Sequence, residues 1–260
     1  MTRTPPRYIE GHQLLEDKTV LVTAAAGTGI GFATAGRCAE EGATVMISDI
    51  HERRLGEAAD ELEKLTGTRP PHLLCNVTEE EEVQRLVSTA ISEMGRIDVL
   101  INNAGLGGTA NIVEMTDDQW NAVLGITLTG TFRMTRATLR HMMERRSGTI
   151  VNNASVLGWR AQAGQAHYAA AKAGVMALTR CAAIEAAEAG VRVNAVAPSL
   201  AVHKFLSKVT PEELLEELAT REAFGQGAEP WEVANVIVFL ASDYSSYMTG
   251  ESISVSSQHP

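Results

Sequence analysis

The chain has 260 residues, of which 45% are hydrophobic and 21% charged, and its formal net charge is −10. This length suits one large α/β domain with a buried core. The negative charge disfavours nonspecific binding to nucleic acid, which is a polyanion, although backbone N–H groups can still hold a phosphate locally. No apolar run reaches the roughly 20 residues that span a bilayer.

Residues 1–17 form an N-terminal extension without the apolar region of a secretory signal. The cysteines Cys38, Cys75 and Cys181 are far apart, and no Cys or His spacing is typical of a metal site. We therefore expect reduced thiols, no metal, no membrane association and a cytoplasmic protein.

Short β-branched segments alternate with longer helical patterns along the chain. Strands are predicted over residues 19–24, 43–49, 71–77, 97–105, 148–155, 191–198 and 251–257, and helices over 29–41, 52–65, 78–95, 117–146, 166–188 and 231–243. This alternation, with nearly continuous apolar strands, predicts a single α/β domain with a doubly wound parallel sheet of about seven strands. Residues 199–229 interrupt the pattern after a strand end, where ligands bind in such folds, so we expect a small substrate lid. A solvated pair of surface helices fits the composition equally well.

A glycine-rich turn links the first strand to the first helix and contains Gly27, Gly29 and Gly31. Glycines let the backbone approach a pyrophosphate, whose charge then meets the helix N-terminus, although a generic packing turn is the alternative. The second strand ends at Asp49, whose carboxylate can bind the ribose hydroxyls of NAD and would repel the 2′-phosphate of NADP. Basic residues at positions 51, 53 and 54 weigh against this preference.

Three further motifs carry polar groups. NNAG (Asn102–Gly105) closes the fourth strand, Ser155 closes the fifth, and YAAAK places Tyr168 and Lys172 four residues apart on one helix face. A nearby ammonium favours the phenolate and makes the tyrosine a better base near neutral pH. Each motif alone is also explained by a turn, a cap or a surface pair.

Together these motifs strongly resemble the short-chain dehydrogenase/reductase family, from about Leu14 to Val255. The resemblance implies a Rossmann domain that transfers hydride reversibly between a nicotinamide and an alcohol or ketone. By the same resemblance, Tyr168 is the general acid/base, Ser155 binds the reacting oxygen, and Lys172 binds the nicotinamide ribose and lowers the pKa of Tyr168. Asn76 stands where the family has an aspartate that contacts adenine. The implied dinucleotide contacts are Ala25, Gly27, Thr28, Gly29, Ile30, Gly31, Asp49, Asn76, Val77, Asn103, Ala104, Gly105, Tyr168, Lys172, Pro198, Ser199 and His203.

Several positions depart from the family pattern. The asparagine of the family's catalytic tetrad falls on Thr127, so we expect activity with an altered proton relay. The first glycine of the dinucleotide loop is Ala25, which requires a tolerable φ there or a small backbone shift. The family's Pro-Gly is Pro198-Ser199, and His203 replaces a threonine that usually meets the nicotinamide carboxamide.

These features predict an NAD-dependent alcohol dehydrogenase that runs mainly as an oxidation. The resemblance is strongest to actinobacterial members of steroid-ring and acyl-CoA catabolism, which implies a bulky cyclic hydroxyacyl-CoA substrate. His203, Lys204, Lys208 and Arg160 are candidate partners for CoA phosphates or ordinary solvated charges. Alternatives are a 3-oxoacyl reductase acting on acyl-carrier-protein or CoA thioesters and a non-catalytic dinucleotide sensor, whereas an enoyl reductase usually spaces its Tyr and Lys further apart. The resemblance also implies a homotetramer.

Overall fold

The computed structural model describes residues 8–202 and 212–257. Seven strands of this part of the chain form one sheet in the order β3-β2-β1-β4-β5-β6-β7, and every neighbouring pair is parallel. The strands are β1 (Thr19–Val22), β2 (Thr44–Asp49), β3 (His72–Leu74), β4 (Val99–Asn102), β5 (Gly148–Asn153), β6 (Val191–Pro198) and β7 (Ser252–Val255). This order confirms the predicted doubly wound Rossmann sheet, in which β2 and β3 lie on one side of β1 and β4 to β7 on the other.

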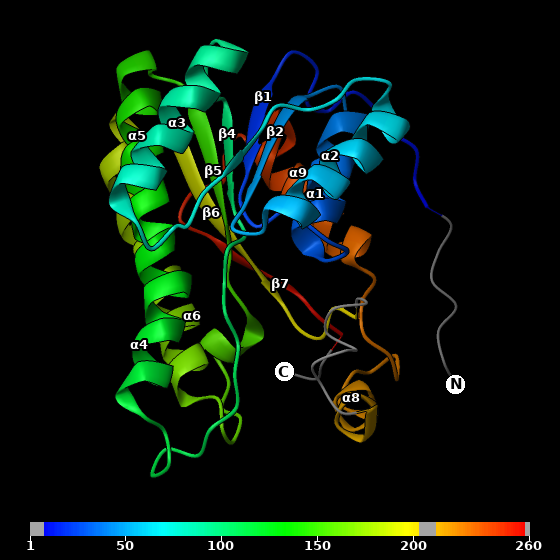
Figure 1. Ribbon diagram of the computed structural model, residues 1–260, viewed down its shortest axis with the longest axis vertical. Coiled ribbons are helices and arrows are strands. Elements are labelled where there is room, and N and C mark those ends of the chain that lie inside the picture. The colour runs from blue at the N-terminus through cyan, green and yellow to red at the C-terminus, as the bar shows by residue number, and fades with distance from the viewer. Residues whose placement is uncertain (1–7, 203–211, 258–260) are drawn as a thin grey trace.

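Helices cover both faces of the sheet (Figure 1). One face carries α1 (Ile30–Glu40), α2 (Glu52–Thr66) and α9 (Pro230–Ala241), and the other carries α3 (Glu80–Met94), α5 (Gly130–Arg145) and α6 (Ala166–Ala186). Sequence signals fix several helix ends. Glutamates lie in the first turns of α2 and α3, where they meet the positive end of the helix dipole, and both helices end at glycines with positive φ, Gly67 and Gly95.

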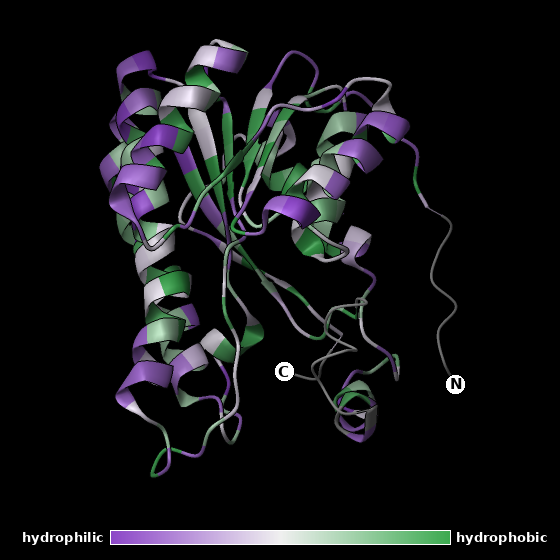
Figure 2. Ribbon diagram, viewed as in Figure 1, coloured by the Kyte–Doolittle hydropathy of each residue, from purple (hydrophilic) through white to green (hydrophobic). Residues whose placement is uncertain are grey.

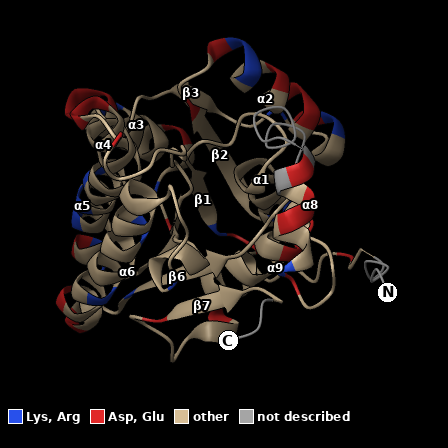
Figure 3. Ribbon diagram, turned by 90° about the horizontal axis from the view of Figure 1, so that it is seen from below, with Lys and Arg blue, Asp and Glu red and all other residues tan. Residues whose placement is uncertain are grey.

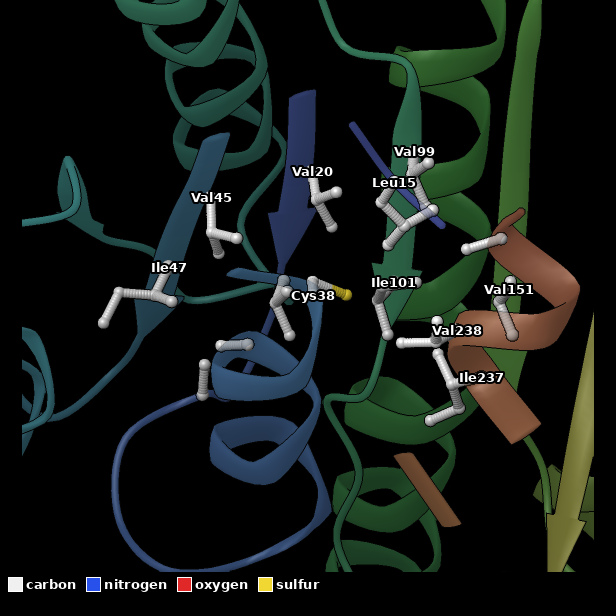
Figure 4. Packing of buried hydrophobic residues seen from close by; sticks show 14 of the residues in the cluster. Leu15, Val20, Cys38, Val45, Ile47, Val99, Ile101, Val151, Ile237 and Val238 are labelled. Carbon is white, nitrogen blue, oxygen red and sulfur yellow. The ribbon is translucent and has the colours of Figure 1, made fainter. Parts of the chain in front are cut away.

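Alternate residues of the strands supply two separate cores. Val20 and Val22 of β1 pack with α1 and α9, whereas Leu21 between them packs with the opposite helices. Figure 4 shows the first core, where valines and isoleucines of β1, β2 and β4 meet Cys38 of α1 and Ile237 of α9. Burial on both faces explains why the strands read as largely apolar segments, and Figure 2 shows green residues along them, interrupted by some polar positions.

The helix predicted over residues 117–146 contains a local change of winding. The structure has α4 (Asp117–Leu124), a π-helical segment (Gly125–Thr129) and then α5. Such segments are rare and concentrate at functional sites. Thr127, the candidate tetrad residue, lies inside the π-helical segment and is buried.

The N-terminal segment packs tightly against α1. The Glu41 carboxylate is fully buried, accepts hydrogen bonds from the backbone N–H groups of His12 (2.7 Å) and Leu14 (3.0 Å), and pairs with Arg37 at 2.6 Å. The neighbouring Leu15 side chain is fully buried in the core. These contacts make the part of the extension from residue 8 onward an integral part of the domain.

The segment after β6 includes α8 (Glu212–Thr220), which lies beyond the carboxyl ends of the strands (Figure 1). Two contacts attach the base of this segment to the rest of the domain. A parallel bridge pairs Ala201 with Ala228, and the buried carboxylate of Glu222 accepts hydrogen bonds from the N–H (3.2 Å) and hydroxyl (2.9 Å) of Ser257. None of the described helices has the length and apolar character needed to cross a membrane.

Candidate active site

In the glycine-rich loop between β1 and α1, one residue other than glycine, Ala24, has left-handed backbone. Ala24 has a positive φ of 50° and Gly27 one of 111°, whereas Ala25 is outside the positive-φ region and fully buried, with its N–H bonded to the Ser48 carbonyl at 3.0 Å. A Cβ atom on Gly31 would collide with the Ala24 carbonyl and the Asn103 amide. At Ala25, where the family has glycine, φ is not positive, as the first of the two predicted solutions requires, and the left-handed residue is its neighbour Ala24.

Asp49 lies at the carboxyl end of β2 and contacts this loop. One carboxylate oxygen accepts the N–H of Ala26 at 3.1 Å, and the other accepts the N–H of His51 at 3.0 Å. Burial raises the pKa of Asp49, while the Ala26 hydrogen bond and the Arg54 charge act in the opposite direction. Each oxygen keeps a lone pair free of these bonds, which ribose hydroxyls can use.

Two pairs of asparagines connect β4 to β5. The amide of Asn102 donates to Asn152 at 2.9 Å, and Asn152 donates to the Thr179 hydroxyl at 2.9 Å, all within the core. One residue further along each strand, Asn153 donates to Asn103 at 2.8 Å. The NNAG and NNAS motifs thus meet side by side at the carboxyl edge of the sheet.

Ser155, Tyr168 and Lys172 come together at the same edge. The Ser155 hydroxyl caps the short turn Val156–Gly158 by accepting the Leu157 N–H at 3.2 Å, and it also hydrogen-bonds the Tyr168 hydroxyl. The Lys172 ammonium lies 5.5 Å from the centre of the Tyr168 ring and donates to the Asn153 carbonyl at 2.5 Å. The four-residue spacing on α6 places both side chains on one helix face.

Burial dominates the electrostatics of this group. It raises the pKa of Tyr168 and lowers that of the Lys172 ammonium to about 8. The interaction that opposes burial at Tyr168 is the hydrogen bond with Ser155. In the free protein, therefore, burial outweighs this hydrogen bond, and the pKa of Tyr168 lies above its ordinary value.

Thr127 completes the wall beside Lys172. Its hydroxyl accepts the N–H of Leu106 at 3.0 Å and lies 3.3 Å from the carbonyl of the same residue. A Cβ atom on Gly105 would lie 3.5 Å from the Lys172 nitrogen and 3.7 Å from the Thr127 hydroxyl. The Thr127 side chain thus anchors the loop after β4, and both of its hydrogen-bonding directions are used there.

The remaining predicted dinucleotide contacts follow β3 or lie at and after the end of β6 in the sequence. The side-chain oxygen of Asn76 accepts the N–H (3.1 Å) and hydroxyl (2.8 Å) of Thr78, so an adenine amino group would have to share it. The Val77 side chain packs closely against Gly130, since a Cβ atom on this glycine would lie 2.6 Å from it. Pro198 ends β6, and the N–H of Ser199 bonds to the Val255 carbonyl at 3.2 Å. His203, Lys204 and Lys208 lie outside the described residues.

Three residues at the site have no role in the sequence analysis. Thr23 accepts the N–H groups of Asn103 (3.0 Å) and Ala104 (3.2 Å), and Asn153 bridges Asn103 and Lys172. His167 is buried, and its Nδ1 accepts the N–H of Tyr168 at 2.9 Å in the first turn of α6. The repetition of NN at two strand ends is the signal that could have indicated Asn153.

A nicotinamide dinucleotide fits the groups along this edge. A Cβ atom on Gly27 would meet nothing within 4 Å, so the loop presents an open backbone surface just before the N-terminus of α1. The buried side-chain oxygen of Asn153 has no hydrogen-bond partner among the described residues. Beside Ser199, a cavity of about 160 Å³ lies between the segment after β6 and the chain after β7. Backbone donors, an acidic strand end and a buried acceptor are the groups that such a ligand needs.

The fold and site define a dinucleotide-dependent oxidoreductase, and the comparisons agree. A family model described as "Enoyl-(Acyl carrier protein) reductase" matches residues 24–257. The chain belongs to the short-chain dehydrogenase/reductase family.

The names of its relatives refer to oxo and hydroxy compounds. A Mycobacterium tuberculosis protein named (5R,7aS)-5-hydroxy-7a-methyl-1-oxo-2,3,5,6,7,7a-hexahydro-1H-indene-carboxyl-CoA reductase is 63% identical over 98% of both chains. A 3-oxoacyl-[acyl-carrier-protein] reductase of Thermotoga maritima is 43% identical over 93% of this chain and 97% of its own. A short chain dehydrogenase from Mycobacterium smegmatis, solved as a crystal structure, has a TM-score of 0.88 at 57% identity and covers 99% of both chains.

Proposed function

We propose that this protein interconverts a secondary alcohol and a ketone on a bulky cyclic CoA thioester, with NAD as the hydride carrier. The observation that carries the proposal is the buried group of Ser155, Tyr168 and Lys172 at the carboxyl edge of the sheet. The four-residue Tyr–Lys spacing supports alcohol–ketone chemistry over the enoyl reduction that the description of the matching family model names. The 63% identical relative, named for a fused-ring carboxyl-CoA, supports the substrate class.

Each residue has a defined task in this reaction. Tyr168 takes the hydroxyl proton of an alcohol or gives a proton to a ketone oxygen, and Ser155 holds that oxygen by a hydrogen bond. Lys172 places a positive charge beside the developing phenolate, and the favourable interaction between them increases as the phenol loses its proton. When bound, the nicotinamide accepts or supplies the hydride. The relative's name favours the reductive direction, opposite to the oxidation expected from the sequence.

The NAD preference rests on Asp49. Its carboxylate is held at the end of β2 by two backbone N–H groups, at the place where a 2′-phosphate would approach. A second negative charge there would be repelled at close range. Dissociation constants for NAD and NADP, measured by calorimetry on the wild type and on Asp49→Ser, test this, and equal affinities in the wild type would contradict the preference.

The proposed substrate class carries the negatively charged phosphates of CoA, so the charge of the protein surface matters for its binding. Figure 3 shows acidic residues in red along the ribbon of α8, and Glu213, Glu216 and Glu217 of this helix are exposed. This acidic surface would repel the phosphates of CoA. We therefore assign the binding of these phosphates to Arg160, five residues after Ser155, and to the basic positions 203, 204 and 208, which follow Pro198. A 3-oxoacyl reductase acting on acyl carrier protein remains the second candidate, supported by the 43% identical relative.

The decisive test is a substrate screen with a catalytic variant. Fused-ring hydroxyacyl-CoA thioesters, free hydroxysteroids, simple alcohols and 3-oxoacyl carrier-protein thioesters are assayed in both directions with each dinucleotide. Tyr168→Phe is expected to lower kcat at least about 100-fold while retaining dinucleotide binding. Tyr244→Phe, at an exposed tyrosine, is the matched control. Full activity of Tyr168→Phe, or turnover of free steroids but not of CoA thioesters, contradicts the proposal. Dinucleotide binding by the wild type without turnover of any substrate supports the alternative of a non-catalytic dinucleotide sensor.

We also infer a homotetramer that forms through α5, α6 and the carboxyl-terminal strand. Phe132 and Met143 of α5 and Ile184 of α6 expose much of their apolar surface, 79% in the case of Ile184. The outer face of α6 also carries the small residues Ala173 and Ala177, which permit close packing between helices.

A further inference from the structure

Asn153 occupies the centre of a polar chain that crosses the site. Its amide nitrogen donates to the side-chain oxygen of Asn103 at 2.8 Å, and the amide nitrogen of Asn103 donates to the Ala24 carbonyl at 3.0 Å. Ala24 is the residue with left-handed backbone in the dinucleotide loop. The side chain of Asn153 therefore reaches the loop through one intermediate.

The bond from Asn153 determines which way the Asn103 amide faces. An amide has a donor end and an acceptor end, so a donor held at one end directs the other end's N–H toward its neighbour. Here that neighbour is the Ala24 carbonyl, which also closely faces Gly31. Rotating the Asn103 amide would place two oxygens against each other at Ala24.

The backbone of Asn153 contacts the catalytic group. Its carbonyl accepts the Lys172 ammonium at 2.5 Å, and Lys172 is buried. One residue thus touches the proposed catalytic lysine through its main chain and the proposed dinucleotide loop through its side chain. A shift of β5 at this point would move both.

Asn152 and Asn153 use their amides differently. Asn152 uses both ends of its amide, accepting from Asn102 and donating to Thr179. The oxygen of Asn153 is buried without a partner among the described residues, so within this part of the chain its amide is bonded through the donor end alone, to Asn103. The contribution of this amide to the described structure is therefore its bond to Asn103.

We propose that Asn153 is a positioning residue that fixes the dinucleotide loop relative to Lys172 by orienting Asn103. The inference rests on the proposed dinucleotide-dependent function. Loss of the Asn153 amide frees the Asn103 side chain, so the Ala24 turn is no longer held in its binding conformation. The consequence is weaker dinucleotide binding, with little change in the handling of the alcohol.

The test is a double-mutant cycle on the full-length protein, with calorimetric titration of NAD as its main measurement. Asn153→Leu is expected to raise the dissociation constant about tenfold, the factor that corresponds to the loss of one hydrogen bond. The Asn103→Ala, Asn153→Leu double variant is expected to bind no more weakly than Asn103→Ala alone, because both changes break the same chain. The KM for the alcohol is expected to stay within about twofold of the wild-type value.

Asn121→Leu, which changes an exposed amide on α4, is the matched control and is expected to bind NAD like the wild type. Asn153→Ser, whose hydroxyl is too short to reach Asn103, replaces Asn153→Leu if the latter does not fold. Additive effects in the cycle, or a lower Tm with unchanged NAD affinity, would overturn the inference. A wild-type protein that binds neither NAD nor NADP would instead refute the proposed function.

Discussion

Ala24 has a backbone conformation that usually belongs to glycine. For a residue with a Cβ atom, left-handed backbone costs about 1 kcal/mol, and here it is held by the Asn103 hydrogen bond to the Ala24 carbonyl. The sequence showed that a glycine was missing from the loop and allowed a tolerable φ at Ala25, which the structure has, but it did not indicate the left-handed backbone at Ala24. That conformation is held by a contact with Asn103, far along the chain, which local sequence cannot indicate.

We therefore predict opposite effects of glycine at two adjacent alanines. Ala24→Gly relieves the strain and is expected to change the free energy of unfolding by between zero and about +1 kcal/mol, since the added freedom of the unfolded chain offsets part of the gain. Ala25→Gly removes a fully buried methyl group without relieving strain, so we expect a loss of about 1–2 kcal/mol. Urea denaturation measures both, and a larger loss for Ala24→Gly would contradict this assignment.

Lys172 gives stability a characteristic dependence on pH. Its pKa is about 8 in the folded protein and about 10.4 in an unfolded chain. Below pH 8 both states bind the proton, so the cost of burying the charge is fully present. Between these values the folded state binds fewer protons than the unfolded state, so the contribution of Lys172 to stability rises with pH.

Replacing this lysine should show that dependence directly. The free energy of unfolding of Lys172→Met minus that of the wild type is expected to fall by about 1–2 kcal/mol between pH 7.5 and 9.5. The reason is that only the wild type is stabilised by deprotonation of the Lys172 ammonium. Lys64→Met, at an exposed lysine of α2, is the control and is expected to show little change over this range. Urea denaturation at several pH values gives the difference, and a flat or rising curve would show that Lys172 is not buried as a cation.

Among the elements, the π-helical segment between α4 and α5 was not predictable. The sequence of residues 117–146 reads as one helix, because no proline separates α4 from α5 and the chain stays helical through the π-helical segment. The helix ends at glycines, by contrast, follow from local signals. The predicted strands are mostly too long: the strands expected over 71–77 and 97–105 are His72–Leu74 and Val99–Asn102, because the polar residues at their ends belong to the following loops. Thr127 was identified from the motif, whereas its bond to Leu106 needed the three-dimensional structure.

The Thr127 hydroxyl should be important for the loop after β4. Thr127→Val keeps the shape but leaves the Leu106 N–H without its acceptor, so we expect a loss of about 1–3 kcal/mol in stability together with a lower kcat. Thr127→Ser retains the hydroxyl and should keep most of both. Thermal denaturation and steady-state kinetics provide the comparison, and equal behaviour of the two variants would remove Thr127 from the site.

At the scale of the whole molecule, the exposed apolar residues of α5 and α6 predict assembly. Ile184→Glu is expected to break the tetramer into smaller species, because a charge would be buried at the contact. Val113→Glu changes a residue that is 91% exposed in the loop before α4 and is expected to leave the mass unchanged. Sedimentation velocity distinguishes the two, and a monomeric wild type would refute the assembly.

The domain architecture was predictable because each strand and helix carries its own apolar pattern, and the order of the sheet is that of the Rossmann domain implied by the family resemblance. The position of Asp49 and the approach of Tyr168 to Lys172 also follow from local spacing. The links between distant segments could not be predicted: Glu41 with the N-terminal segment, Glu222 with Ser257, and Asn103 with Asn153. Each depends on polar atoms that meet only after the chain has folded.

The strand order also bears on synthesis at the ribosome. β1 lies between β2 and β4, so the centre of the sheet cannot close until β4, which ends at Asn102, has left the exit tunnel. Until then the apolar edge of β1 is unpaired and open to other chains. β7 joins last, at the edge beside β6, and with it the Glu222–Ser257 contact at the base of the α8 segment. A nascent chain can therefore bury much of its core before its final residues complete the surroundings of the site.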